Sequence, residues 1–410
     1  MPLIDVDLSS PDTFVPGVPH EAFRRLRREA PVYWQESCEP EQRGFWSITR
    51  YEDLKAISKN PALFSSARGG VNLWTPDEEM LKRLRHIMLY MDPPQHRRYR
   101  NIVNKAFTPR MVQQLLPSVR RLAREIVDSV AEKGEADFVH EIAAKLPMAV
   151  ICEMMGVEEE DRLPIYDLSN RMVGSDDPEI STTEEEAIQA NVAMFQYAAK
   201  VAERARRQPG DDLATALLQA EVDGERLSEL DFNSFFLLLA VAGNETTRTV
   251  TCNGMLSLLQ NRDQMRLLQQ DPSLIPSGVE EMLRYEPAVM HFRRTATADL
   301  ELRGQRIRAG DAVVLWYPSV NRDEAVFEDP DRFDVRRDPN DHLAFGVGEH
   351  YCLGANLARM ELVVIFEELL RRLPDLEMAG PVRRLRSNFM NGVKAMPVRF
   401  SPGDPGTLVE

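Results

Sequence analysis

The sequence predicts a mainly α-helical protein with a small β portion, folded as a single domain over residues 1–410. Helical periodicity dominates from about Arg97 to Glu286 and returns after Cys352. Strand-like runs are short and few. Proline and glycine are spread evenly, without an internal repeat or a low-complexity linker, so one compact unit is favoured over the two or three domains that length alone would allow.

The minor β portion is predicted from four short runs of apolar and β-forming residues. These runs are residues 44–48, 300–302, 312–316 and 395–400. The helical stretches are several times longer than any of these runs. The sheet is therefore expected to be a small part of the fold.

The longest predicted helix runs from Ser228 to Asn261. Ser228 and Asp231 form a variant of the capping box that starts a helix. A helix of this length would extend about 50 Å at roughly 1.5 Å per residue, so it would cross the whole molecule. A second helix is expected from Asp271 to Tyr285, and Pro287 stops it.

Composition and charge exclude several classes of protein. The net charge of −15 argues against nonspecific binding of nucleic acid. Residues 1–7 lack the features of a signal peptide, and the longest clean apolar run, residues 235–243, is far too short to span a membrane. Four scattered cysteines form no Cys-x-x-Cys pair, so neither a zinc site nor a disulfide framework is indicated. A soluble, cytoplasmic protein is expected.

Candidate chemistry is found first in the glycine-rich segment 345–354, Phe-Gly-Val-Gly-Glu-His-Tyr-Cys-Leu-Gly. Cys352 precedes a predicted helix, residues 355–364, so it lies near free backbone N–H groups and the positive end of the helix dipole. Both effects favour a thiolate, which would act as a metal ligand or a nucleophile. The alternative is that Cys352 is a small buried apolar residue, as most lone cysteines are.

A second unusual segment, residues 242–248, lies inside the long helix and reads Ala-Gly-Asn-Glu-Thr-Thr-Arg. Glycine inside a helix costs about 1 kcal/mol relative to alanine, and a threonine hydroxyl can turn to the carbonyl one turn back and bend the helix. Gly243, Glu245 and Thr246 therefore indicate a functional site. A helix that becomes polar where it leaves the core would explain the same residues equally well.

The spacing Phe-Gly-x-Gly-x-His-x-Cys-x-Gly, filled at every fixed position, resembles the haem-ligand loop of the cytochromes P450. The resemblance implies haem b as the cofactor, Cys352 as its axial thiolate ligand, and Phe345 and Gly354 as cofactor-binding residues of the loop. It also implies the fold of this family, with the long helix lying over the haem. The family's elements occur in order from about residue 12 to residue 400, so the resemblance covers nearly the whole chain.

Residues 242–247 resemble the family's Ala-Gly-x-(Asp/Glu)-Thr-(Thr/Ser) segment, and this resemblance implies catalytic roles on the long helix. Gly243 becomes the gap in which dioxygen sits. Glu245 and Thr246 become the carboxylate and the hydroxyl that deliver the protons needed for O–O cleavage in an otherwise apolar site.

Glu281 and Arg284 lie three residues apart on one face of a predicted helix. Taken alone, they would be an ordinary surface ion pair of little energetic value. The resemblance implies instead that the pair is buried and stabilises the core beneath the haem. This is a structural role and not a catalytic one.

The resemblance further implies that basic residues bind the two haem propionates. Buried carboxylates need paired donors, and arginine supplies two of them in a planar fork. The candidates are His96, Arg100, Arg294 and His350. His96 and Arg100 lie four residues apart on one helix face, which favours ligand binding. Three neighbouring cations are interpreted as solvated surface charges, namely Arg97, Arg98 and Arg293.

The expected reaction inserts one oxygen atom of O₂ into a C–H bond of a hydrophobic small molecule. Segments that line the substrate pocket by resemblance carry little charge, so the substrate is expected to be mostly hydrocarbon. Residues 242–248 and 386–394 resemble those of enzymes that oxidise sterol side chains and branched lipids. A terpenoid or polyketide hydroxylase is the alternative. The predicted pocket residues are Leu238, Val241, Ala242, Val289, Met290, Phe292 and Met390.

Electrons are expected from a separate ferredoxin and its reductase, because no flavin or ferredoxin domain is visible in the sequence. A basic patch on the cysteine side would steer an acidic ferredoxin. A peroxide-using haem-thiolate enzyme would not need Glu245 and Thr246, and a haem sensor would need an effector domain, so both are less favoured. The candidate patch residues are Arg97, Arg98, Lys105 and Arg359.

Overall fold

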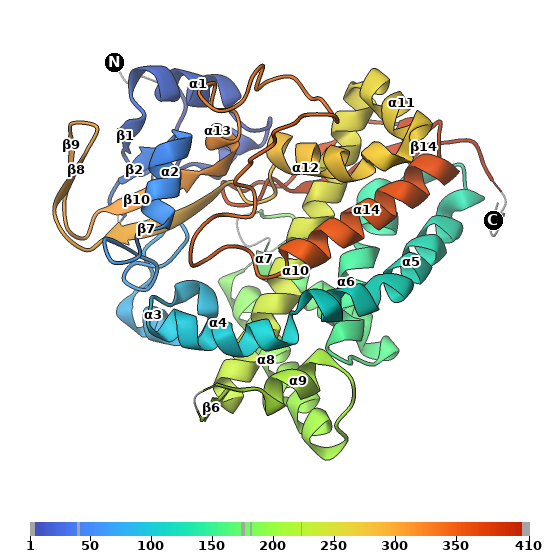
Figure 1. The fold of residues 1–410 in the computed structure, drawn as a ribbon, viewed down its shortest axis with the longest axis horizontal. Helices are drawn as coiled ribbons and strands as arrows, with labels where there is room; N and C mark the ends of the chain where they lie inside the picture. Colours follow the sequence, from blue (N-terminus) through green and yellow to red (C-terminus); the bar gives the residue numbers. More distant parts are fainter. Residues whose placement is uncertain (1–4, 39–41, 174–176, 181–182, 223, 404–410) are drawn as a thin grey trace.

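Helices make up most of the computed structural model, which describes residues 5–38, 42–173, 177–180, 183–222 and 224–403 (Figure 1). The predicted mainly α fold with a small β portion is confirmed. The helices are α1 (His20–Glu29), α2 (Tyr51–Ser58), α3 (Glu78–Leu84), α4 (Gln95–Ala106), α5 (Pro109–Ala131), α6 (Lys145–Met154), α7 (Arg162–Val173), α8 (Glu184–Arg207), α9 (Leu213–Gln219), α10 (Glu229–Gln260), α11 (Arg262–Gln270), α12 (Ile275–Tyr285), α13 (Tyr317–Val320) and α14 (Ala355–Arg372). The strands are β1 (Val32–Gln35), β2 (Phe45–Ile48), β3 (Phe64–Ser65), β4 (Glu135–Asp137), β5 (Glu221–Val222), β6 (Glu225–Arg226), β7 (His291–Ala296), β8 (Leu300–Leu302), β9 (Gln305–Ile307), β10 (Ala312–Trp316), β11 (Glu377–Met378), β12 (Arg383–Arg384), β13 (Val393–Ala395) and β14 (Pro397–Arg399).

The long helix α10 runs through the middle of the molecule and packs against α6, α8, α12 and α14 (Figure 1). At its start the hydroxyl of Ser228 accepts from the N–H of Asp231 at 3.1 Å, and the Asp231 carboxylate accepts from the N–H of Ser228 at 3.2 Å. This capping box satisfies two backbone donors that a helix start leaves free. The predicted helix from Ser228 to Asn261 is confirmed, since these two residues cap its ends.

The second predicted helix, residues 271–285, is right at its end and wrong at its beginning. Residues Pro272–Leu274 form a separate 3-10 turn, and α12 starts only at Ile275. The Asp271 carboxylate caps this turn by accepting a backbone N–H two residues further on at 3.1 Å. Pro276 then falls in the first turn of α12, where a proline needs no N–H partner.

A five-stranded sheet lies beside the helices in the order β1-β2-β10-β7-β3, and only β2 and β10 run parallel within it. The predicted strands 44–48, 300–302 and 312–316 correspond to β2, β8 and β10. The predicted strand 395–400 is not one strand, because β13 and β14 pair with different partners. β7 escaped prediction because its sequence, His-Phe-Arg-Arg-Thr-Ala, places two charges inside a mostly buried strand.

The ion pair on α12 joins the helical part of the fold to the segment after β10. Arg284 binds Glu281 through two hydrogen bonds of 2.7 and 2.8 Å, and both side chains are fully buried. Arg284 also donates to the carbonyl oxygens of Asn321 and Pro330 at 2.9 and 2.8 Å. The expected burial of this pair is therefore observed, and every charge in it has close partners.

Within the ranges that the structure describes, no helix combines the length and the apolar character needed to cross a membrane. All four cysteines are free thiols.

Candidate active site

The sequence-predicted site residues meet around one cavity, called here the main cavity, between α10, the segment 344–354, α14 and β7. α10 forms one wall, and the start of α14 with the preceding loop forms another. Every predicted catalytic, cofactor-binding and pocket residue except Met290 lines it. These residues are His96, Arg100, Leu238, Val241, Ala242, Gly243, Glu245, Thr246, Val289, Phe292, Arg294, Phe345, His350, Cys352, Gly354 and Met390.

Glycine conformations shape the loop that carries Cys352. Gly346 and Gly348 have φ angles of +70° and +83°, which side chains rarely adopt. A Cβ on Gly348 would also lie 2.7 Å from the backbone oxygen of Ser58. The N–H of Cys352 donates to the carbonyl of Phe345 at 2.9 Å, which closes the loop and directs the thiol to the main cavity.

The expected effect of the helix start on the Cys352 thiol is outweighed by burial. Burial raises the pKa of Cys352, whereas the Gly354 N–H and the cations Arg100 and Arg359 lower it by less. The helix start therefore acts in the expected direction, but its effect and that of the two cations are smaller than the effect of burial. A metal cation bound to sulfur would supply the missing stabilisation, because a coordinating thiol is deprotonated outright.

The polar segment of α10 presents Gly243 and Thr246 to the main cavity. The Thr246 hydroxyl donates to the carbonyl oxygen of Ala242 at 2.6 Å, as expected for a threonine that turns back on its own helix. A Cβ on Gly243 would lie 2.4 Å from Cδ1 of Ile151 on α6. Gly243 is thus required for the close approach of α6, and the gap for dioxygen stays a prediction.

Glu245 is almost fully buried and forms an ion pair with Arg248, one turn further along α10. Burial opposes the charge of Arg248, but the Glu245 carboxylate and, together with it, Tyr166 raise the pKa of Arg248. Only Oε2 of Glu245 takes part in this pair. Oε1 is buried and has no hydrogen-bond partner among the described residues.

Four basic side chains gather at one end of the main cavity. The rings of His96 and His350 are 4.2 Å apart, and Arg100 and Arg294 line the same region. Both ring nitrogens of His96 are buried and have no hydrogen-bond partner among the described residues, while His350 has Ser66 Oγ at 3.2 Å from Nε2. In the described parts of the chain, no acid forms an ion pair with any of the four basic groups.

The electrostatics of this cluster fit an anionic ligand. Burial, reinforced by Arg100, lowers the pKa of His96 to about 4, and burial lowers the pKa of His350 well below its usual range. Burial likewise lowers the pKa values of Arg100 and Arg294. Donors that are buried together without an anion are unstable unless a ligand brings one. Two carboxylates, as haem carries, match this set.

Tyr317 belongs to the same end of the main cavity and was missed in the sequence. It is buried, lies close enough to Arg294 for the two to affect each other's pKa, and its hydroxyl has no partner in the described chain. The hydroxyl lies 3.7 Å from the position that a Cβ on Gly346 would take. The only signal in the sequence was a tyrosine directly after the predicted strand 312–316.

Met290 does not line the main cavity, so its assignment to the pocket is wrong. Val289 and Phe292 face the cavity, whereas Met290 packs into a separate core with Phe14 and Trp316. A short extended segment turns successive side chains to opposite faces, and the sequence did not reveal its register. The sequence also missed Ile151 and Glu361, which do line the cavity.

Glu361 is a buried acid on α14 that lines the main cavity. Burial raises its pKa to about 8, and its Oε2 has no partner among the described residues. Its neighbours one turn away on the helix, Leu357 and Ile365, are buried apolar residues. An acid at this spacing within an apolar face was the signal that could have identified it.

The interpretation of Arg293 as a surface charge is also wrong. Its side chain is buried and donates to the carbonyl of Leu73 at 3.0 Å and to Thr75 Oγ1 at 2.7 Å. Arg97 and Arg98 are exposed, as expected, and pair with Glu349 and Glu225.

The remaining two candidates for a basic patch are also engaged. Lys105 donates to the backbone oxygen of Glu221, and Arg359 forms an ion pair with Glu280 at 2.6 Å. The four patch candidates therefore carry local partners on the protein's own surface.

Comparisons with known proteins agree with this geometry. The family described as Cytochrome P450 matches residues 14–380. A methyl-branched lipid omega-hydroxylase of Mycobacterium tuberculosis is 42% identical, and the match covers 98% of this chain and 96% of that protein. A steroid C26-monooxygenase of Rhodococcus jostii is 38% identical over 98% of this chain and 86% of its own length. A linalool 8-monooxygenase of Pseudomonas putida is 38% identical over 97% and 99%.

Solved structures give the same result. A Mycobacterium marinum cytochrome P450 in complex with pseudoionone superposes with a TM-score of 0.90 at 39% identity, covering 98% of this chain and 99% of that one. A Bacillus megaterium cytochrome P450 in complex with testosterone has a TM-score of 0.83 at 32% identity, covering 94% and 99%. The match thus extends over sequence and fold along nearly the whole chain, and the chain belongs to the cytochrome P450 family, as a haem-iron oxidoreductase of the monooxygenase class.

Proposed function

We propose that this monooxygenase hydroxylates a hydrophobic molecule of the sterol side-chain or branched-lipid class, with haem b as its cofactor. Relatives that match nearly the whole chain are named methyl-branched lipid omega-hydroxylase and steroid C26-monooxygenase. The alternative is a terpenoid or polyketide substrate. It is supported by the linalool 8-monooxygenase at 38% identity and by a structural relative from a polyketide synthase at 35%.

The observation that carries the substrate class is the distribution of charge in the main cavity. Its basic groups gather at one end, where they suit the propionates of haem. Glu245 is paired with Arg248, and Glu361 with a pKa of about 8 is largely neutral at pH 7. Among the described lining residues, no charged group is left for the substrate. A mostly hydrocarbon substrate therefore fits the remaining wall.

In the proposed mechanism, Cys352 binds the iron and four side chains hold the propionates. Bound haem supplies the activation of dioxygen for insertion into a C–H bond. His96, Arg100, Arg294 and His350 orient the cofactor through hydrogen bonds to its carboxylates. The apolar side chains of α10, β7 and the segment at Met390 orient the substrate and exclude water.

Proton delivery is assigned to α10. Thr246 releases its bond to Ala242 and offers its hydroxyl to the reaction side, and Glu245 resupplies the proton. Gly243 leaves room for dioxygen beside them. The overall reaction consumes two electrons and two protons for each R–H and O₂, and it yields R–OH and water.

Electrons are proposed to come from a ferredoxin and its reductase in the cytoplasm. The four free thiols fit a reducing compartment. Arg97 and Arg98 lie exposed on α4, the helix that also brings His96 and Arg100 to the main cavity. Charge reversal at Arg97 and Arg98 should slow reduction and weaken its dependence on salt. Unchanged rates and salt dependence would remove this docking site.

The test of the substrate class is an optical titration of the purified ferric protein. Cholest-4-en-3-one, a methyl-branched fatty acid and a monoterpene alcohol are added separately, and the shift of the main haem band is followed. Saturable shifts with the steroid or the branched acid support the proposal and justify product analysis. A shift with the terpene alone favours the alternative, and a protein without a haem band would contradict the cofactor assignment.

The prediction that residues 1–410 form a single domain stays a prediction. It is supported by the Mycobacterium marinum structure, which matches 98% of the chain as one fold.

A further inference from the structure

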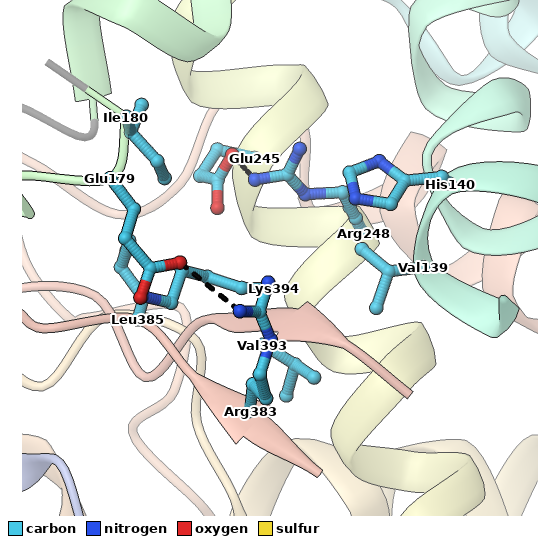
Figure 2. A pocket seen from close by; sticks show the side chains of 10 residues that line it. All are labelled: Val139, His140, Glu179, Ile180, Glu245, Arg248, Arg383, Leu385, Val393 and Lys394. Carbon is cyan, nitrogen blue, oxygen red and sulfur yellow. Dashed lines mark hydrogen bonds and ion pairs between the residues drawn. The ribbon is translucent and has the colours of Figure 1, made fainter. Parts of the chain in front are cut away.

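Glu245 lines a second cavity in addition to the main one (Figure 2). This second cavity has a volume of about 240 Å³. It lies between α10, the turn Phe138–Ala143, residues 179–180 and the hairpin of β12 and β13. The side chains that surround it are Val139, His140, Glu179, Ile180, Glu245, Arg248, Arg383, Leu385, Val393 and Lys394.

The second cavity leads from the surface to the buried helix. Glu179 and Arg383 form an ion pair at its outer end, with side chains 56% and 59% exposed. Lys394, 13% exposed, pairs with Glu179 at 3.1 Å. At the inner end Arg248 is 11% and Glu245 only 3% exposed. A passage of this size with charged groups along its length is expected to hold several water molecules.

At the inner end, one carboxylate oxygen of Glu245 lacks a hydrogen-bond donor that such water could supply. In Figure 2, one carboxylate oxygen of Glu245 meets Arg248, and the other points away from Arg248 into the second cavity. This second oxygen, Oε1, is buried and has no hydrogen-bond donor among the described residues. A buried carboxylate oxygen without a donor is costly, so a water molecule is the expected partner.

We propose that the second cavity is the inlet through which protons reach Glu245, and that Arg248 is the positioning residue that keeps Oε1 turned toward it. This inference rests on the proposed role of Glu245 in proton delivery. It adds the side from which the protons come, a residue that orients the carboxylate, and a water-filled space that is separate from the substrate.

A second cavity would supply protons to Glu245 while the substrate occupies the main cavity. A hydrocarbon substrate in the main cavity displaces water from the apolar wall, so solvent protons cannot arrive beside it. Glu245 lines both spaces, so a proton accepted at Oε1 from the second cavity is carried to the main cavity when the carboxylate turns, and the ion pair with Arg248 then returns Oε1 to the second cavity. Water at Oε1 donates a proton and regains one from solvent at the outer end, so each of the two protons consumed per turnover is replaced.

Arg248 sets the orientation of the Glu245 carboxylate. Its ion pair with Oε2 fixes one carboxylate oxygen, so the other is left for the second cavity. Arg248 also donates from Nη1 to the hydroxyl oxygen of Tyr166 at 3.5 Å, which helps to hold the guanidinium in place. Losing the cation should free the carboxylate to rotate, whereas a lysine in its place retains the charge and part of the restraint.

The first test fills the inlet. Ile180→Trp places a large side chain in the second cavity, and Ile180 does not line the main one. The matched control is Ile188→Trp, at an exposed position on α8 that lines neither cavity. In the holoenzyme with its reductase system, Ile180→Trp should lower turnover about tenfold and increase the solvent deuterium isotope effect. Substrate affinity by optical titration should stay unchanged, and the control should match the wild type.

The second test combines Ile180→Trp with Glu245→Gln. If protons reach Glu245 through the second cavity, Glu245→Gln already stops their transfer. Filling the cavity with Ile180→Trp should then have no additional effect. Turnover of the double variant should therefore equal that of Glu245→Gln alone. An equal loss from Ile180→Trp in both backgrounds would overturn the inlet, as would a silent Ile180→Trp in a protein that depends on Glu245.

The role of Arg248 has its own readout. Arg248→Met should divert electrons from product to peroxide while leaving substrate affinity unchanged, and Arg248→Lys should restore much of the lost product yield. Equal defects in both variants would mean that Arg248 has only a structural role. If Glu245→Gln itself leaves turnover and product yield intact, the proposed role of Glu245 fails, and this outcome is distinct from a failure of the inlet.

A crystal structure of the holoenzyme would show directly whether a water molecule binds Glu245 Oε1, without any activity assay. An ordered water within about 3.2 Å of Glu245 Oε1, inside the second cavity, is the expected result. A dry cavity, or a Glu245 carboxylate that turns both oxygens to the main cavity, would contradict the inlet.

Discussion

Gly243 of α10 faces Ile151 of α6 so closely that a Cβ on the glycine would lie 2.4 Å from the isoleucine Cδ1. Both residues line the main cavity. The glycine in the middle of the long helix is therefore explained by helix packing at the site itself. Its neighbour on α6 comes from a segment nearly a hundred residues earlier, in which nothing in the sequence marked a site residue.

This contact predicts the outcome of a paired substitution. Gly243→Ala should destabilise the protein by about 1–3 kcal/mol through overpacking, although alanine favours a helix by about 1 kcal/mol. Ile151→Val removes the methyl group that clashes, so the double variant should regain most of the loss. Thermal unfolding of the two single variants and the double variant measures this coupling. Strictly additive effects would show that Ile151 is not what Gly243 accommodates.

The parts of the site that could be predicted from the sequence are those fixed by local spacing. The loop at Cys352 and the polar segment of α10 each lie within ten residues, so their geometry follows from the order of residues along the chain. His96 and Arg100 share a helix face for the same reason. The roles assigned to these residues stay predictions, but their convergence on one cavity was foreseeable.

The parts that could not be predicted depend on register and on distant partners. Met290 was assigned to the main cavity with Val289 and Phe292, but successive side chains of an extended segment turn to opposite faces, and Met290 packs against Trp316 instead. Arg293 was taken for a surface charge because its partners, Leu73 O and Thr75 Oγ1, come from a loop about 220 residues earlier. Tyr317 and Ile151 carry no motif, and only the fold brings them to the main cavity.

The buried pair on α12 predicts a large loss of stability when it is broken. Glu281→Gln leaves Arg284 as a buried cation without its carboxylate, which should cost about 3–5 kcal/mol. A matched control is Glu125→Gln, which removes an exposed i,i+4 pair with Arg121 and should cost about 0.5 kcal/mol or less. Chemical denaturation of the holoenzyme compares them. Similar losses of unfolding free energy in the two variants would mean that burial does not make the Glu281–Arg284 ion pair more stabilising than an exposed one.

Tyr317 predicts a change in haem retention that is separate from protein stability. Because its hydroxyl forms no hydrogen bond with the described residues and lies near Arg294, Tyr317→Phe should weaken cofactor binding and speed haem loss to a scavenger by several-fold. The protein without haem should be no less stable, since the substitution removes no hydrogen bond to a described residue.

The control for this prediction is another buried tyrosine. The Tyr99 hydroxyl donates to the carbonyl of Asp231 at 2.6 Å. Tyr99→Phe should therefore lower the unfolding temperature without a change in the rate of haem loss. The reverse pattern in the two variants would show that the Tyr317 hydroxyl does not face the cofactor.

Glu361 predicts a pH dependence whose sign follows from its burial. Its pKa is about 8 in the folded protein, above the value of about 4.3 expected in an unfolded chain. Below both values the acid is neutral in both states and has no effect. As pH rises from about 4.3 to 8, the unfolded state releases the proton and the folded state keeps it, so folding becomes steadily less favourable.

Glu361→Gln removes this titration while keeping the shape of the side chain. The unfolding temperature of the variant should therefore rise relative to the wild type between pH 5 and pH 8, by an amount that corresponds to a few kcal/mol at the upper end. Above pH 8 the difference should level off, since the acid is then ionised in both states. Parallel curves for the two proteins across this range would mean that Glu361 finds a charge-stabilising partner when haem is bound.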